Sequence, residues 1–235
     1  MSAGKSDVMI DGPDGTFSAY VAGDSGGQKP GLLVIQEIFG VNQVMRDLCD
    51  GYAAAGYVAL CPDLFWRQEP GIQLTDQSEA EWGRAFQLYQ GFDEAAGVRD
   101  LVAALDHLRG LVSCSGVAGT IGWCLGGKLA YLMATRSDAD ANVGYYGVAI
   151  EAALDEADRI THPLMLHMAG KDQFCPPEAQ AQIRAALDGN PNVTLHAYES
   201  CDHAFARLGG AHYDAAAAAL ANDRTAAFLA EHLAL

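Results

Sequence analysis

A cysteine between closely spaced glycines follows an apolar segment in the middle of the chain. Gly122, Cys124 and Gly126 form the pattern G-x-C-x-G, which matches the tight turn that presents a nucleophile between a strand and a helix. In such a turn, the residues two positions before and after the nucleophile must be small. The helix dipole and the free N–H groups of the first turn would favour a thiolate at Cys124. The N–H of Leu125 would be placed to bind a developing oxyanion.

Two other interpretations of this segment compete with a nucleophile. Cys124 could be a buried structural thiol, with the glycines serving helix–strand packing. A phosphate-binding turn is the second alternative, but residues 122–128 match neither G-x-G-x-x-G nor G-x-x-x-x-G-K-[ST]. The local pattern therefore leaves a nucleophile and a structural thiol open.

A carboxylate and a histidine follow later in the order that a nucleophilic triad of this type requires. Asp172 comes after the apolar segment 164–168, and His203 comes after the segment 193–198. Because the carboxyl ends of parallel strands meet at one edge of a sheet, both side chains are expected at the same edge as Cys124. Asp63 and Asp202 are rival acids, but one precedes the nucleophile and the other adjoins His203. The sequence therefore predicts the set Cys124, Asp172 and His203.

The other histidines have a weaker case for function. A surface position or a hydrogen-bonded core position is the favoured interpretation for each of them, because histidine is commonly intermediate in burial. They are His107, His162, His167, His196, His212 and His232.

The elements that must position these residues alternate between strands and helices. Short apolar segments are typical of strands buried on both faces of a parallel sheet, and helices between them imply right-handed crossovers. The prediction is an α/β fold with a doubly wound, mostly parallel sheet, helices on both faces, and a single domain over residues 1–235. The expected strands are 32–35, 57–60, 117–122, 143–146, 164–168 and 193–198. The expected helices are 43–55, 78–109 with a break near Gly91, 125–135, 177–187 and 213–233, and residues 64–75 are expected to form a loop.

Composition excludes several classes of partner. The chain has 235 residues and a net charge of −16, so nucleic acid and anionic membranes are poor partners. No apolar run approaches the ~18 residues of a membrane span, and residues 1–7 lack the apolar core of a signal peptide. We therefore expect a cytoplasmic protein, a monomer or small homo-oligomer, whose six cysteines are free thiols.

Taken together, these motifs resemble the dienelactone hydrolase family. The resemblance extends over residues 31–229 and is carried by residues 36–40, 122–127, 145–147, 170–172 and 203–207. It implies an α/β-hydrolase fold, a Cys-His-Asp triad and no cofactor. It also implies that Glu37 lies close to the cysteine and helps to switch it between thiol and thiolate, and that the N–H of Ile38 is the second oxyanion donor.

The same resemblance suggests substrate-binding residues. Arg207 matches an arginine that grips a substrate carboxylate, a role that suits the guanidinium fork. The chain departs from the family pattern in the long helical stretch, where Trp82 stands in place of a second carboxylate-binding arginine. Arg84 is two residues away and is a candidate substitute, although a helix turns about 200° over two residues. Trp82 is assigned to an apolar pocket, Phe86 to the core, and Tyr145 to the substrate-binding set.

The expected activity is hydrolysis of a small ester or lactone of the dienelactone type. Cys124 would attack the carbonyl to form a thioacyl-enzyme, and His203, oriented by Asp172, would carry the proton. One alternative is a catalytically idle homologue that senses thiol chemistry or binds a small molecule. Another is metal-assisted hydrolysis through Cys201 and His203, but the sequence offers no further ligands at metal spacing, so no metal is expected.

Overall fold

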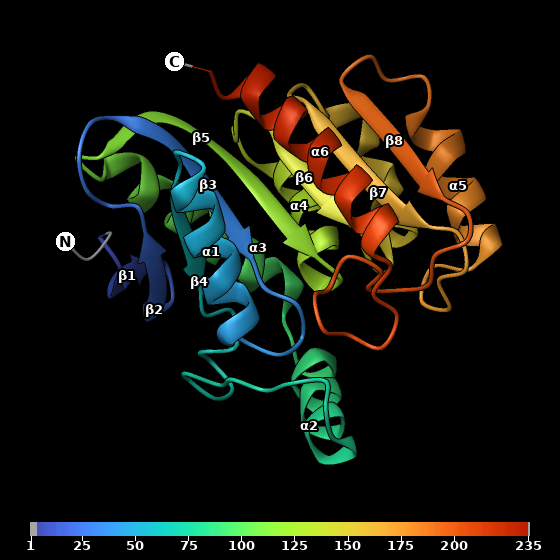
Figure 1. Ribbon diagram of the computed structural model, residues 1–235, viewed down its shortest axis with the longest axis horizontal. Coiled ribbons are helices and arrows are strands. Elements are labelled where there is room, and N and C mark those ends of the chain that lie inside the picture. Colours follow the sequence, from blue (N-terminus) through green and yellow to red (C-terminus); the bar gives the residue numbers. More distant parts are fainter. Residues whose placement is uncertain (1–3, 235) are drawn as a thin grey trace. The chain divides into compact units, whose positions relative to one another are not determined.

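The computed structural model describes residues 4–234 and has an α/β architecture (Figure 1). The described chain forms two compact units, one up to Gly119 and one from Thr120 to Ala234. Strand β5 (Cys114–Trp123) leads from the first unit into the second. The assignment of residues 1–235 to a single domain stays a prediction.

The first unit contains a sheet with the strand order β1-β2-β4-β3. Strands β1 (Ser6–Gly12) and β2 (Gly15–Ala22) form a hairpin, and β2 pairs antiparallel with β4 (Val58–Pro62). Strand β3 (Lys29–Ile35) pairs parallel with β4. The predicted strands at 32–35 and 57–60 are thus confirmed, whereas the N-terminal hairpin is an element that we did not predict.

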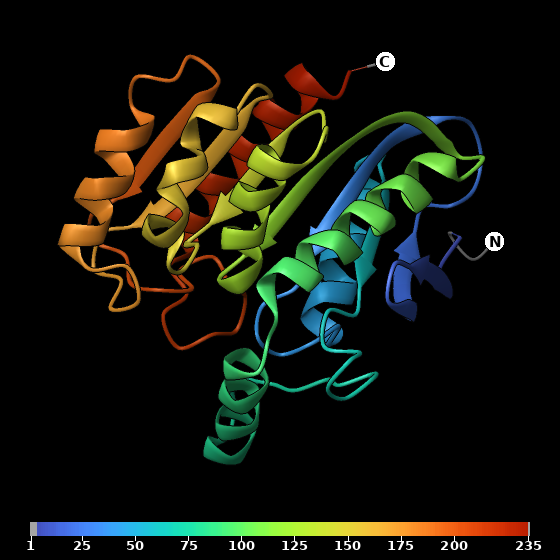
Figure 2. The same ribbon diagram turned by 180° about the vertical axis from the view of Figure 1, so that it is seen from behind.

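Three helices complete the first unit. Helix α1 (Gln43–Ala54) covers one face of its sheet and α3 (Glu94–Gly110) covers the other (Figures 1 and 2). Helix α2 (Glu79–Gln90) is separated from α3 by a short turn at Gly91, which confirms the predicted break. Asp93 begins α3, because its side chain accepts a hydrogen bond from the N–H of Ala96 at 2.9 Å and so caps the helix.

The second unit contains the parallel strands that carry the predicted triad. Strands β5, β6 (Asn142–Tyr145), β7 (Leu164–Ala169) and β8 (Val193–Tyr198) lie side by side in that order. Their pairing is parallel throughout, and it aligns Trp123 with Tyr145, Tyr145 with His167, and His167 with His196. The carboxyl ends of β5, β6 and β7 therefore lie at one edge of this sheet.

Helices lie on both faces of the second unit. Helix α6 (Ala215–His232) lies on one face (Figure 1), and α4 (Leu125–Arg136), α5 (Pro177–Leu187) and the 3₁₀ segment η1 (Ile150–Arg159) lie on the other (Figure 2). Every residue from Leu125 to Thr135 is buried. A helix that is buried on all sides is typical of the centre of a packed domain. The residue that begins α4, Cys124, is therefore held in a well-packed environment.

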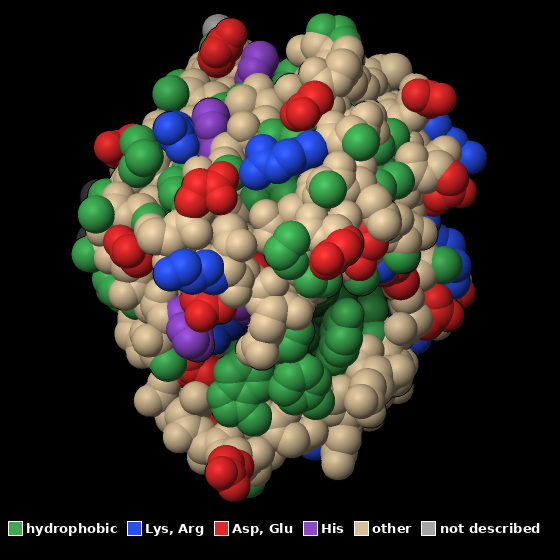
Figure 3. Space-filling view, turned by 90° about the vertical axis from the view of Figure 1, so that its right-hand side faces the viewer, with side chains coloured by type: hydrophobic (Ala, Val, Ile, Leu, Met, Phe, Trp, Pro, Cys, Tyr) green, Lys and Arg blue, Asp and Glu red, His purple; other side chains and the backbone are tan. Residues whose placement is uncertain are grey.

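The described residues agree with the compositional expectations in two respects. All six cysteines are buried free thiols, as predicted. Within residues 4–234, every helix is too short or too polar to cross a bilayer. On the face shown in Figure 3, acidic side chains are spread among basic ones, and a group of hydrophobic side chains is exposed.

A buried polar cluster joins the sheet of the second unit to α6. The Nδ1 of His167 lies 2.9 Å from the hydroxyl of Tyr198, and its Nε2 lies 2.9 Å from the hydroxyl of Thr225. Thr225 also lies 2.7 Å from the hydroxyl of Tyr145. Burial, together with the charges of His196 and Arg224, lowers the pKa of His167 to about 3. The core interpretation of His167 is thereby confirmed.

The neutral state of His167 makes the stability of the fold depend on pH. The unfolded chain protonates this histidine near pH 6.5, whereas the folded chain does so only near pH 3, so its contribution is complete above pH 6.5 and is lost as the pH falls toward 3. Between pH 7 and pH 5 the loss is about 2 kcal/mol. Urea unfolding of the wild type and of His167→Asn at both pH values measures this change in the free energy of unfolding. The variant is expected to lose less stability over this interval, and His212→Asn, at an exposed position, serves as the control. Equal losses in all three proteins would contradict this assignment.

Candidate active site

The turn between β5 and α4 holds Cys124 in a strained backbone conformation. Its φ of 56° lies in the left-handed region, which non-glycine residues adopt rarely. The N–H of Cys124 donates to the carbonyl of Tyr145 at 3.0 Å, and its own carbonyl accepts from the N–H of Gly127 at 3.0 Å. These hydrogen bonds fix the strained residue from both sides. Cys124 keeps 8% of its surface exposed, so solvent can reach it.

Close backbone contacts explain the glycines of this turn. A Cβ atom on Gly122 would lie 2.1 Å from the carbonyl oxygen of Gly126, and one on Gly127 would lie 2.5 Å from that of Tyr145. Gly144 on β6 approaches the same helix, since its Cβ would lie 2.7 Å from the oxygen of Gly127. Gly122 therefore must be small, as the sequence pattern predicted. Gly127 and Gly144 must be small as well, because α4 and β6 are in close contact there.

Asp172 and His203 form a buried pair on the loops that follow β7 and β8. The Nδ1 of His203 lies 2.7 Å from Oδ2 of Asp172, and both side chains are nearly inaccessible to solvent. The other carboxylate oxygen, Oδ1, accepts a hydrogen bond from the N–H of Phe174 at 2.8 Å. Both oxygens of Asp172 are thus engaged, and the imidazole is fixed in orientation.

The imidazole of His203 is also hydrogen-bonded to the side chain of Cys124. Burial disfavours the charged form of His203, but hydrogen bonds to Asp172 and Cys124, with the attraction of their charges, outweigh burial and raise the pKa to about 10. The structure therefore brings the three predicted side chains together in one unit. An imidazole held between a cysteine side chain and a carboxylate is an arrangement that can support nucleophilic chemistry.

The two rival acids have other partners. Asp202 accepts a hydrogen bond from the backbone N–H of His203 at 3.0 Å, so it caps the loop. Asp63 belongs to the first unit, where it accepts hydrogen bonds from the N–H groups of Phe65 and Gly71 at 3.0 and 2.7 Å. Asp172 is the carboxylate that lies 2.7 Å from the ring of His203, so the choice of Asp172 agrees with the geometry.

Comparison with known proteins assigns the chain to a family. Residues 17–233 match the model of the dienelactone hydrolase family. The chain belongs to this family.

Relatives and solved structures agree with that assignment. The chain is 55% identical over 228 residues to a protein of Azospirillum brasilense named "Putative carboxymethylenebutenolidase", covering 94% of this chain and 96% of that one. It is 42% identical to the carboxymethylenebutenolidase of Pseudomonas putida, with 95% of each chain covered. The crystal structure of a "Putative Dienelactone Hydrolase" from Klebsiella pneumoniae matches with a TM-score of 0.84 at 26% identity, covering 97% and 98% of the chains. An esterase of Pyrococcus furiosus, Pf2001, matches with a TM-score of 0.70 at 16% identity, covering 97% and 93%. The predicted α/β-hydrolase fold is confirmed, and the chain is a hydrolase.

Two aromatic rings lie against the imidazole of His203. Phe174 and Tyr146 lie edge-on to His203, with ring centroids at 4.8 and 5.1 Å. Phe174 is 38% exposed, so its ring offers an apolar surface beside the imidazole. The sequence analysis missed both residues. Their positions, two residues after Asp172 and one after Tyr145, were the only signal.

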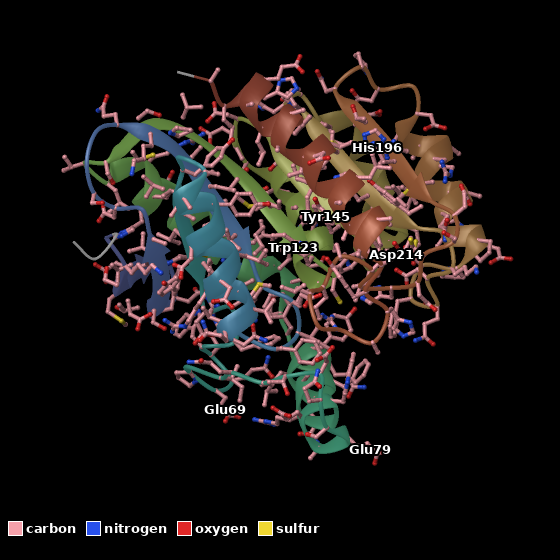
Figure 4. The ribbon with its side chains drawn as sticks, viewed as in Figure 1. Glu69, Glu79, Trp123, Tyr145, His196 and Asp214 are labelled. Atoms are coloured by element: carbon pink, nitrogen blue, oxygen red, sulfur yellow. The ribbon has the colours of Figure 1, made fainter. Side chains whose placement is uncertain are left out.

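Tyr145 itself does not lie at the triad. It is fully buried, and its hydroxyl lies 2.7 Å from that of Thr225 and 3.0 Å from Oδ1 of Asn222, both on α6 (Figure 4). The side chain of Tyr145 therefore belongs to the buried polar cluster, and only its carbonyl contacts Cys124. Tyr146 is the tyrosine that contacts His203.

Arg207 lies in the turn that follows His203. It is buried, its N–H donates to the carbonyl of Ala204 at 2.9 Å, and its carbonyl accepts from the N–H of Gly210 at 3.0 Å. The backbone of Arg207 is therefore fixed relative to His203.

The remaining predicted site residues belong to the first unit. Glu37 and Ile38 are buried directly after β3, and the carbonyl of Glu37 accepts a hydrogen bond from the side chain of Gln36 at 3.2 Å. On α2, Trp82 packs edge-on against Phe39, with centroids at 5.0 Å. Arg84 is held by Glu69, which accepts hydrogen bonds from its Nε and one terminal nitrogen, so the guanidinium already has an anionic partner.

The core position predicted for Phe86 is wrong. Phe86 is 36% exposed and stacks on Trp82, with centroids at 5.6 Å. Helix α2 buries only Ala85 and Leu88, so its aromatic face remains at the surface. In the described part of the chain, no group of three or more His, Cys, Asp or Glu side chains is arranged to hold a metal ion.

The high pKa of His203 predicts the effect of removing its carboxylate partner. Asp172→Asn removes the negative charge that stabilises the protonated imidazole, while His203 stays buried. The pKa of His203 is therefore expected to fall by about 1 to 3 pH units. Titration of the imidazole by NMR from pH 6 to pH 10 measures it. Asp202→Asn is the control, because Asp202 accepts from the backbone N–H of His203 and lies near His212 instead of bonding the ring of His203. A pKa that stays near 10 in Asp172→Asn would show that the pair with Asp172 does not set the charge of the imidazole.

Proposed function

We propose that this dienelactone hydrolase family member opens a small enol-lactone, or cleaves a related ester, through a thioester on Cys124. The arrangement that carries the proposal is the hydrogen-bonded series from Cys124 through His203 to Asp172. The thiolate of Cys124 attacks the carbonyl carbon, and His203 remains protonated beside it. The buried carboxylate of Asp172 stabilises that imidazolium.

The start of α4 is the proposed oxyanion site. Leu125 is the first residue of the helix, and N–H groups in the first turn have no partner within the helix. The N–H of Leu125 would donate to the carbonyl oxygen as it gains negative charge, and the helix dipole would add to this effect. The family resemblance supplies the N–H of Ile38 as the second donor.

The reaction then proceeds in two steps, ring opening to the thioester and hydrolysis of that thioester. Collapse of the first tetrahedral intermediate breaks the ring C–O bond, and the enolate leaving group takes the proton from His203. His203 then removes a proton from water, the hydroxide attacks the thioester carbon, and the thiolate of Cys124 leaves. The proton on His203 restores the starting imidazolium. The carboxylic acid that is released loses its proton to solvent, and the protonated enolate oxygen remains in the product as an enol or its keto tautomer. A thiolate suits this substrate because an enolate leaves easily and a thioester hydrolyses readily.

The names of the relatives and the position of Arg207 support the proposed substrate class. A carboxymethylenebutenolide is an enol-lactone that bears a carboxylate, and the relatives at 42–55% identity carry names for its hydrolysis. We propose that Arg207 binds that carboxylate and that Trp82 contributes an apolar wall. Arg84 is not part of this proposal, because Glu69 already occupies its guanidinium. Tyr145 is not part of it either, because its hydroxyl bonds to α6.

Glu37 is the proposed partner of the resting cysteine. The support is its identity and place in the sequence, immediately after β3, together with its burial. By analogy with the family, its carboxylate would accept the proton of the thiol and release a thiolate when substrate enters.

Replacement of Cys124 tests the proposed function. Cys124→Ala removes the nucleophile, so turnover of a dienelactone or a chromogenic ester is expected to fall at least about 10³-fold. The control is Cys114→Ala, which removes a buried thiol at the start of β5. Full activity in Cys124→Ala would refute the mechanism. A wild type that alkylates at Cys124 but turns over none of these substrates would favour a non-catalytic thiol-binding protein instead.

Replacement of Arg207 tests the substrate assignment. Loss of a charge-assisted pair is expected to raise KM for a carboxylate-bearing dienelactone about tenfold or more in Arg207→Ala, with a much smaller effect on a neutral ester. Steady-state kinetics on the two substrates separate the effects. Arg184→Ala, on the surface of α5, is the matched control. Equal effects of Arg207→Ala on both substrates would exclude the carboxylate role.

A further inference from the structure

The turn that carries Asp172 is held at both ends by one side chain from the next helix. Gln180 lies on α5, and its Nε2 lies 3.2 Å from the carbonyl oxygen of Ala169, at the end of β7. The same nitrogen lies 2.8 Å from the carbonyl oxygen of Cys175 and 3.4 Å from that of Gly170. One amide group thus spans the segment 169–175 and closes it into a compact turn.

Gln180 is a polar residue at a buried position where an apolar residue would be expected. It is 8% exposed, and its neighbours on the inner face of α5 are Ala179, Ile183 and Leu187. Burial of an amide is costly unless its polar atoms find partners, and here the partners are backbone carbonyls of the turn. The side chain therefore matches the geometry of this one turn.

The other side of the turn is fixed against the segment that leads to His203. The N–H of Gly170 donates to the carbonyl of Tyr198 at 2.9 Å, and the N–H of Lys171 donates to that of Cys201 at 2.9 Å. A Cβ on Gly170 would lie 2.5 Å from Cα of Glu199, so the two backbones are in direct contact. The turn is therefore held between Gln180 and residues 198–201.

The contacts with Gln180 and with residues 198–201 together determine where the carboxylate of Asp172 lies. Gln180 fixes the residues before and after Asp172, and the contact with residues 198–201 fixes the distance to the loop of His203. The result is the 2.7 Å separation between Oδ2 of Asp172 and Nδ1 of His203. Small displacements in such an arrangement cost much activity, since about 1 Å can cost about 10²-fold in rate.

We propose that Gln180 is a positioning residue for the hydrolysis, because it ties both ends of the Asp172 turn and so holds the carboxylate against His203. This inference rests on the proposed function of the Cys124–His203–Asp172 set. Gln180 contacts neither substrate nor the reacting atoms in this account, and it acts only through Asp172.

The test compares two methionine substitutions on the same helix. Gln180→Met keeps the length of the side chain and removes the donors, whereas Gln182→Met makes the same change at an exposed position. In Gln180→Met, kcat is expected to fall about 10- to 100-fold while KM stays within about threefold. Gln182→Met is expected to match the wild type in both constants.

A spectroscopic signature distinguishes positioning from a general loss of stability. The proton between Nδ1 of His203 and Asp172 should give a far-downfield ¹H NMR signal in the wild type and in Gln182→Met. It is expected to weaken or move upfield in Gln180→Met at temperatures well below unfolding. If Gln180→Met does not fold, Gln180→Asn, which keeps the amide one methylene shorter, gives the same comparison.

The outcomes separate this inference from the proposed function. A wild-type kcat or an unchanged downfield proton in the folded Gln180 variant would overturn the role of Gln180. Full turnover in Cys124→Ala would instead overturn the proposed function. The NMR signal requires no substrate, so it judges the role of Gln180 even if the substrate class is wrong.

Discussion

The arrangement of the second unit depends on keeping a charged imidazole inside the protein. Burial alone would hold His203 neutral, and the rings of Tyr146 and Phe174 strengthen that tendency by excluding water. The carboxylate of Asp172 and the side chain of Cys124 reverse it, because hydrogen bonds and charge attraction from both raise the pKa of the ring. A buried charge of this kind persists only when its partners are held at hydrogen-bonding distance. The surrounding backbone therefore has to be rigid, and the strained Cys124 turn and the compact Asp172 turn both meet that requirement.

Parallel strand pairing places the three groups at one edge of the sheet. The register aligns Trp123, Tyr145, His167 and His196 in one row across the four strands. Cys124 follows this row immediately, while Asp172 and His203 follow it after short loops. The glycines let the start of α4 approach β6 closely. Cys124 therefore lies beside the carboxyl end of β6, where its N–H donates to the carbonyl of Tyr145. The hydrogen bonds between the Asp172 turn and residues 198–201 then set the distance between acid and base.

Much of this could be predicted from the sequence because local chemistry dictated it. The glycine spacing around Cys124 and the helix break at Gly91 follow from steric rules that apply within a few residues, and the order of acid and histidine follows from the topology of a parallel sheet. The N-terminal hairpin gave a weaker signal, since β1 is largely exposed and its pattern is mixed. Phe86 was misjudged because helical spacing shows which residues share a face, but not what that face packs against. Tyr145 was assigned from the family resemblance, which does not show that its hydroxyl bonds to α6. The contacts of Gln180 with the Asp172 turn have no sequence signature, since they depend on carbonyl groups that only the folded turn brings together.

The most direct measurement of the central claim is detection of the acyl group on the cysteine itself. The chain would be mixed with a slow chromogenic ester, quenched in acid within the first turnover, digested and examined by mass spectrometry. If Cys124 is the nucleophile, the sample will show a burst of leaving group equal to the enzyme concentration and an acyl mass on the peptide that contains Cys124. Continued turnover with the acyl mass on another residue, or with no acyl adduct in a burst-phase sample, would contradict it.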